Sequence, residues 1–174
     1  RKPAGILALV AIVLAVWAVR GSAQSQRPRM VISATDIQSI QEALGKVPLF
    51  DRAYAEAKET VDRALARPID VPVPKDAGGY THEKHKQNYV EMQLAGILFQ
   101  VTHDERYAVF IRDMLLKYAT LYPTLGRHPM TASKAYGKLF WQSLNETVWM
   151  VHVAQAYDCI YDWLTPNDRT VIES

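Results

Sequence analysis

The chain has 174 residues, enough for about one domain, and a formal net charge of +2 at pH 7. So small a charge does not indicate a nucleic-acid-binding protein, because such proteins carry a clear excess of cations. Its one cysteine, Cys159, excludes a disulfide within the chain, so a large hydrophobic core is expected to stabilise the fold.

The first 23 residues have the layout of a secretory signal peptide. Two basic residues lie near the start, an apolar run covers residues 4–19, and small residues end at Ala23. The run is shorter than the ~20 residues that a membrane-spanning helix needs. We therefore expect cleavage after Ala23, a linker over residues 24–34, and a periplasmic or secreted protein. Membrane attachment is expected only if the signal stays uncleaved.

The chain beyond the linker is predicted to be almost entirely helical. A short helix is expected over residues 35–44, capped by Thr35 or Ser33, and an amphipathic helix over residues 51–66. Three prolines within residues 67–74 then predict an extended segment, because proline lacks the N–H that a helix requires.

Two glycines, Gly78 and Gly79, predict a tight turn or a mobile loop before the next helix. That helix is expected to run from its cap at Thr81 to about Val101, and a further amphipathic helix is expected over residues 104–122. Residues 123–137 then form a long irregular loop, and loops of this length inside compact domains are often functional.

A helix predicted over residues 139–164 differs from its neighbours in composition. Glu146 is its only formal charge before Asp158, which predicts a helix buried on nearly all sides. The amphipathic helices over residues 51–66 and 104–122 should then lie outside it. Inner and outer helices in alternation are what a ring of antiparallel helix pairs requires, and solvent along one side of this helix would count against the ring.

Two polar, aromatic segments, residues 78–89 and 138–146, lie where loops are expected to run into helices. Their side chains are of the kinds that stack on sugar rings or hydrogen-bond hydroxyls and carboxylates. Residues 114–145 contain four cations and no Asp or Glu, which suits an acidic partner unless the gap is chance. The residues predicted to bind a saccharide are Tyr80, His82, Lys134, Lys138, Trp141, Gln142 and Asn145.

The polar side chains of the 139–164 helix have two interpretations. Trp141, Asn145, Val148 and His152 lie near one line at 100° per residue. They either form a wall of a sugar cleft or belong to a buried helix whose few polar groups bond to neighbouring backbone.

No metal or cofactor is predicted. His82 and His85 are three positions apart, whereas the zinc protease motif needs four, so they are expected to cap a helix and present polar groups to a ligand. His128, in the acid-free loop, is a further candidate. No serine-hydrolase, phosphate-loop or dinucleotide motif occurs, and the available glutamates form no glycosidase pair.

Four segments together carry a family resemblance: residues 70–89, 122–126, 139–146 and 154–169. They resemble the N-terminal helical domain of the alginate lyase and heparinase II/III-like polysaccharide lyases, in particular the oligoalginate lyase branch.

The resemblance implies an all-α fold, an incomplete (α/α) toroid of antiparallel helix pairs over residues 35–174, truncated at its C-terminus. It implies a carbon–oxygen lyase that cleaves alginate or another uronate polymer by β-elimination, with an anionic uronate saccharide as its partner. The family's catalytic Asn-His pair and Tyr are expected beyond Ser174, so the fragment alone should be inactive. The alternatives are a glycosaminoglycan lyase, an uronyl hydrolase, or a non-catalytic carbohydrate-binding helical domain.

Overall fold

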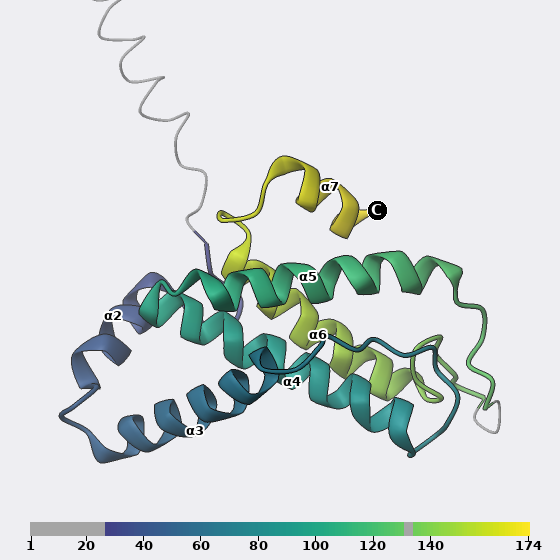
Figure 1. Cartoon of the computed structure of the whole chain (residues 1–174), viewed down its shortest axis with the longest axis horizontal. Coiled ribbons are helices and arrows are strands. Elements are labelled where there is room, and N and C mark those ends of the chain that lie inside the picture. Colours follow the sequence, from purple (N-terminus) through teal and green to yellow (C-terminus); the bar gives the residue numbers. More distant parts are fainter. Residues whose placement is uncertain (1–26, 131–133) are drawn as a thin grey trace, which may run out of the picture.

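The computed structural model describes residues 27–130 and 134–174, which contain only helices, turns and loops (Figure 1). The all-helical fold is therefore confirmed, whereas the toroid stays a prediction. The predicted signal peptide lies outside the described residues. The helices are α2 (Ala34–Ala43), α3 (Pro48–Leu65), α4 (Tyr80–Thr102), α5 (Glu105–Leu121), the 3-10 turn η1 (Tyr122–Thr124), α6 (Ser143–Ile160) and α7 (Pro166–Glu173).

Local capping bonds set the start of two helices, and at α2 the cap is Ser33, one of the two predicted candidates. At α2, the Ser33 hydroxyl accepts from the Asp36 backbone N–H while the Asp36 carboxylate accepts from the Ser33 backbone N–H. Thr165 and Asp168 form the same reciprocal pair at α7. Each pair satisfies two backbone donors that a helix start otherwise leaves open.

Helix α4 is the centre of the fold, in contact with α2, α3, α5 and α6 (Figure 1). It buries apolar side chains over most of its length, including Met92 and Leu98, and these join one core with residues of α3, α5 and α6. Gly96 allows the backbone of α6 to come close, because a Cβ at this position would lie 3.0 Å from Cβ of Cys159. The most buried helix is thus α4.

Helix α6 is not buried on nearly all sides, and that prediction is wrong. Its apolar side chains Leu144, Val148 and Val151 are exposed along one side. The opposite side, which includes Trp149 and Ile160, packs against α4 and α5, and no element of the described residues covers the outer side. This exposure counts against a ring closed within the described part of the chain.

The segment before α2 is held on the end of α6 by Asp158. This buried carboxylate pairs with Arg27 at 2.6 Å and accepts the backbone N–H groups of Arg29 and Met30 at 2.7 and 2.9 Å. Burial tends to raise the pKa of Asp158, but these donors hold it below the ordinary value. Residues 27–30 are therefore part of the folded domain.

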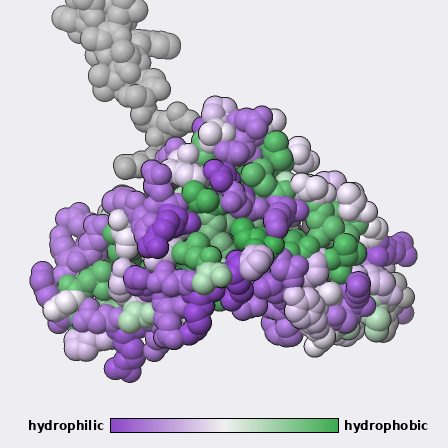
Figure 2. All heavy atoms as spheres, in the orientation of Figure 1, coloured by the Kyte–Doolittle hydropathy of each residue, from purple (hydrophilic) through white to green (hydrophobic). Residues whose placement is uncertain are grey.

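Hydrophobic side chains also gather in the middle of one face of the molecule, over α5 (Figure 2). Within the described ranges, no helix combines the length and apolar character that a membrane crossing requires.

Candidate functional site

The two polar segments predicted from the sequence meet where α4 and α6 begin. The side-chain amide nitrogen of Asn145 lies 3.3 Å from Nε2 of His82. The ring of Phe140 packs at right angles to the His82 ring, with centroids 5.2 Å apart. Side chains from α4, from the loop before α6 and from α6 itself therefore share one small region.

Asp76 shapes the first turn of α4. Its carboxylate accepts the backbone N–H groups of Gly79, Thr81 and His82 at 2.7 to 3.2 Å, and the Thr81 hydroxyl at 2.7 Å. Burial opposes ionisation, but these donors outweigh it and hold the pKa of Asp76 far below its usual range. The predicted cap, Thr81, is instead the second residue of the helix, because Asp76 supplies the cap from outside it and Gly79 stands at the cap position.

His82 lies at the base of this region. When the Asn145 amide nitrogen donates to Nε2, the ring hydrogen lies on Nδ1, which has no hydrogen-bond partner among the described residues. His82 is only 7% exposed, whereas Asn145 is half-buried. A ligand from solvent would therefore meet Asn145 before His82.

The loop before α6 is folded back on itself by main-chain bonds. The Gly137 N–H donates to the Phe140 carbonyl at 3.1 Å, and the Ser143 N–H donates to the Ala135 carbonyl at 2.7 Å. Residues 139–142 are consequently not helical, and α6 begins at Ser143, four residues later than predicted. Composition alone did not indicate this fold of the loop.

Five predicted residues lie on the elements that meet here. Lys138 is exposed, with its ammonium group 5.1 Å from the centre of the Tyr122 ring. Gln142 is half-buried at the cap position of α6, and its side chain makes no capping bond to the helix. Trp141 is half-buried beside it. We call the following set the candidate site: His82, Lys138, Trp141, Gln142 and Asn145.

The structure does not bring Tyr80 to the candidate site. Its hydroxyl donates to the Asp70 carboxylate, and positions 80 and 82 point about 200° apart on a helix. Lys134 is exposed on the loop. The binding of a saccharide by Tyr80 and Lys134 stays a prediction.

His85 is a core residue, and the prediction that it faces a ligand is wrong. It is fully buried, and its Nδ1 is hydrogen-bonded to the Tyr118 hydroxyl at 2.9 Å. Asn88 donates to the same hydroxyl oxygen at 3.1 Å and to the Asp70 carbonyl at 2.8 Å. Burial lowers the pKa of His85 to about 4, so the ring is neutral at pH 7.

Two other histidines have local partners. His128 is buried, its Nδ1 accepts from the Met130 N–H at 3.1 Å, and burial lowers its pKa. His152 bonds to the Val148 carbonyl and packs against Tyr89. Across residues 27–130 and 134–174, no group of three or more His, Cys, Asp or Glu side chains is arranged to hold a metal ion.

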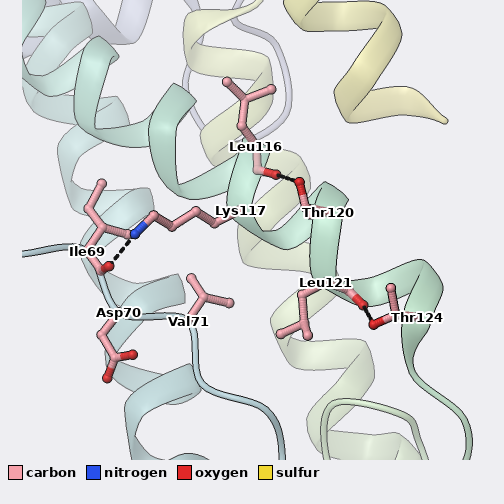
Figure 3. Close-up of a pocket in the computed structure, with 8 residues that line it drawn as sticks. All are labelled: Ile69, Asp70, Val71, Leu116, Lys117, Thr120, Leu121 and Thr124. Atoms are coloured by element: carbon pink, nitrogen blue, oxygen red, sulfur yellow. Dashed lines mark hydrogen bonds between the residues drawn. The ribbon is translucent and has the colours of Figure 1, made fainter.

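A groove of about 620 Å³ lies elsewhere, between the extended segment and α5 (Figure 3). Lys117 reaches across it, and its ammonium group donates to the Ile69 carbonyl at 2.6 Å. The hydroxyls of Thr120 and Thr124 are bonded to carbonyls of their own helical turns. None of the predicted saccharide-binding residues lines this groove, so its geometry does not mark it as the site.

The molecule is thus an all-helical domain with a polar site at the start of two packed helices. It is similar to an exo-oligoalginate lyase of Saccharophagus degradans, with 41% identity over 167 residues, which are 95% of this chain and 23% of that protein. It is also similar to an alginate lyase of Stenotrophomonas maltophilia, with 42% identity over 152 residues, which are 87% of this chain and 20% of that protein. No protein-family model matches the chain.

The resemblance to alginate lyases is therefore confirmed, and the chain is homologous to part of these two proteins. It spans less than a quarter of the length of either.

Proposed function

We propose that this chain is part of a polysaccharide lyase that cleaves alginate or oligoalginate by β-elimination. The observation that carries the proposal is the 41% identity over 95% of the chain to a protein named as an exo-oligoalginate lyase. The substrate would be a uronate polymer, which suits the absence of Asp and Glu over residues 114–145.

The reaction makes specific demands on a protein. A base removes the C5 proton of a uronate, the C4 oxygen leaves, and a double bond forms between C4 and C5. Negative charge develops next to the uronate carboxylate, so groups that neutralise this carboxylate lower the barrier. A base and an acid are also needed, and one tyrosine placed between C5 and the leaving oxygen can serve as both.

The described residues suit substrate binding. Lys138 offers a positive charge, and the half-buried amides of Gln142 and Asn145 offer donors to carboxylates and hydroxyls. Trp141 offers an aromatic face for a sugar ring. The catalytic residues are expected in the part of the protein beyond Ser174, by resemblance to the family.

The test is the product formed by the full-length gene product from alginate. Elimination gives an unsaturated uronate that absorbs in the ultraviolet, and the absorbance should rise with the number of chain ends. Saturated products would establish hydrolysis and overturn the lyase proposal. Cleavage of glycosaminoglycans but not of alginate would show that the protein is a glycosaminoglycan lyase. Binding without cleavage would favour a carbohydrate-binding domain.

We also propose that the protein is exported, on the basis of the predicted signal over residues 1–23. The mature protein should begin near Gln24 and occur in the periplasm or the medium. Mass spectrometry of the N-terminal peptide decides this, since an intact N-terminus in the membrane fraction would contradict cleavage.

The full-length protein, we propose, continues the helical domain into an (α/α) toroid. The greater length of the relatives supports this. The exposed apolar side of α6 at Leu144, Val148 and Val151 is not itself support, and in a closed ring further helices would have to cover it. A structure of the full-length protein in which this side faces solvent would contradict the proposal.

A further inference from the structure

The side chain of Glu146, next to Asn145 of the candidate site, takes an unusual direction. It lies in the first turn of α6, but its side chain reaches back toward the loop that precedes the helix. Its two oxygens accept the backbone N–H groups of Lys138, Leu139 and Phe140 at 2.8 to 3.3 Å. Three successive backbone donors therefore converge on one side chain.

A fourth donor completes this arrangement. The Tyr122 hydroxyl donates to Glu146 at 2.9 Å, and the Tyr122 ring stacks on Trp149 with centroids 5.4 Å apart. The ammonium group of Lys138 also lies over the Tyr122 ring. Glu146 thus joins the loop to η1 and, through Tyr122, to the core.

The Glu146 carboxylate occupies space that a side chain at position 137 would fill, and this position is a glycine. A Cβ at position 137 would lie 2.5 Å from Oε2 of Glu146 and 2.8 Å from the Phe140 carbonyl oxygen. Real Cβ atoms do not approach other atoms so closely, so any side chain here would displace the carboxylate or the loop. The bonds between Glu146 and the loop therefore depend on a glycine at position 137.

We propose that Glu146 is a positioning residue, which holds residues 137–142 in the conformation that places Lys138, Trp141 and Gln142 at the substrate. This inference rests on the proposed function. Carboxylates that accept several backbone N–H groups form strong bonds, and such bonds restrict the backbone more than a side-chain contact does. Glu146 acts through the loop and does not touch the sugar.

The first measurement does not depend on activity. In the full-length gene product, hydrogen exchange is followed in the peptide that covers residues 137–142, for the wild type, Glu146→Gln and Gly137→Ala. Both variants should exchange the amides of Lys138, Leu139 and Phe140 at least about tenfold faster, because both break the same bonds from opposite sides. Glu59→Gln, on the exposed side of α3, is the control and should leave this peptide unchanged.

The second measurement separates positioning from general stability. With oligoalginate, both variants should raise KM about tenfold while kcat stays within about threefold, because the loop carries binding groups and the catalytic groups lie elsewhere. A residue needed only for the N-terminus of α6 would change exchange in α6 and leave KM alone.

The outcomes are distinct. Unchanged exchange in residues 137–142 would overturn the role of Glu146 in the loop. Faster exchange with an unchanged KM would overturn the positioning of binding residues. A wild type that cleaves no uronate polymer would overturn the proposed function and with it the placement at a substrate, while the exchange data would still establish what holds the loop.

Discussion

The amide nitrogen of Asn145 lies 3.3 Å from Nε2 of His82, and this contact joins residues 63 positions apart in the sequence. It connects the first turn of α4 with the first turn of α6. The packing of α4 against α6 along their lengths brings the two turns together, since the Gly96 position allows the close approach of the helices. The candidate site is therefore a consequence of how the central helix packs.

The contact should contribute to the local stability of both helix starts. His82→Ala and Asn145→Ala, singly and together, form a double-mutant cycle in the full-length protein. We expect a coupling free energy of about 0.5–1.5 kcal/mol, the usual net value of a hydrogen bond, from hydrogen exchange in the first turns of α4 and α6. Strictly additive effects of the two changes would show that the two side chains do not interact.

Local signals were sufficient to predict several elements. The cap at Ser33, one of the two caps predicted for α2, and the proline-rich segment depend on neighbours in sequence, so the sequence was sufficient to predict them. The late start of α6 was missed because Glu146 bonds to backbone groups of a folded-back loop, and composition carries no sign of such bonds.

Tertiary packing also decided which polar residues became core residues. His85 and His82 have similar surroundings in the sequence, but His85 turns toward α5 and bonds to Tyr118, whereas His82 turns toward α6. The three-residue spacing did not distinguish these two directions. The exposed side of α6 was missed for a related reason, since an apolar helix alone does not show which of its sides the rest of the chain covers.

Tyr118→Phe should destabilise the protein although it removes only one oxygen. The hydroxyl accepts from Asn88 and lies 2.9 Å from Nδ1 of His85, so its loss leaves this buried ring nitrogen without a partner, whereas Asn88 keeps its bond to the Asp70 carbonyl. We expect a loss of about 1–3 kcal/mol in the free energy of unfolding. Urea-induced unfolding measures it, with Tyr161→Phe near the end of α6 as a control. Equal stability of Tyr118→Phe and the wild type would show that the network adds nothing.

Asp158 should make the stability of the domain depend on pH. Its pKa in the folded protein lies below the ordinary value of 3.8, so its contribution to stability is fully present above pH 3.8. The contribution is then lost as the pH falls below 3.8 through the folded-state pKa. Asp158→Asn should cost about 3 kcal/mol at pH 7, because it leaves Arg27 without its charge partner.

The comparison across pH separates this effect from general acid sensitivity. The stability difference between Asp158→Asn and the wild type should shrink in acid, whereas Asp162→Asn, an exposed change four residues away, should make little difference at any pH. Hydrogen exchange at the amides of Arg29 and Met30 should rise only in the Asp158 variant. A difference that is constant from pH 7 to acid would exclude the carboxylate as its source.

Asn145 and Tyr80 are both predicted to bind a saccharide, and the structure gives them different surroundings, which the sequence did not indicate. Asn145 is half-buried beside His82, whereas Tyr80 is exposed and bonded to Asp70 on another side of α4. In the full-length protein, Asn145→Ala should lower kcat/KM on oligoalginate by about ten- to a hundredfold, because a hydrogen bond to a charged group is worth ~1.5–3 kcal/mol. Tyr80→Phe should change it by less than about threefold, because its hydroxyl is bonded to Asp70.

Thermal unfolding of the Asn145→Ala and Tyr80→Phe variants shows whether a loss of activity in either one results from a loss of folding. If the folded Tyr80 variant loses activity while the folded Asn145 variant keeps it, the site lies on the other side of α4, and the five-residue assignment is wrong.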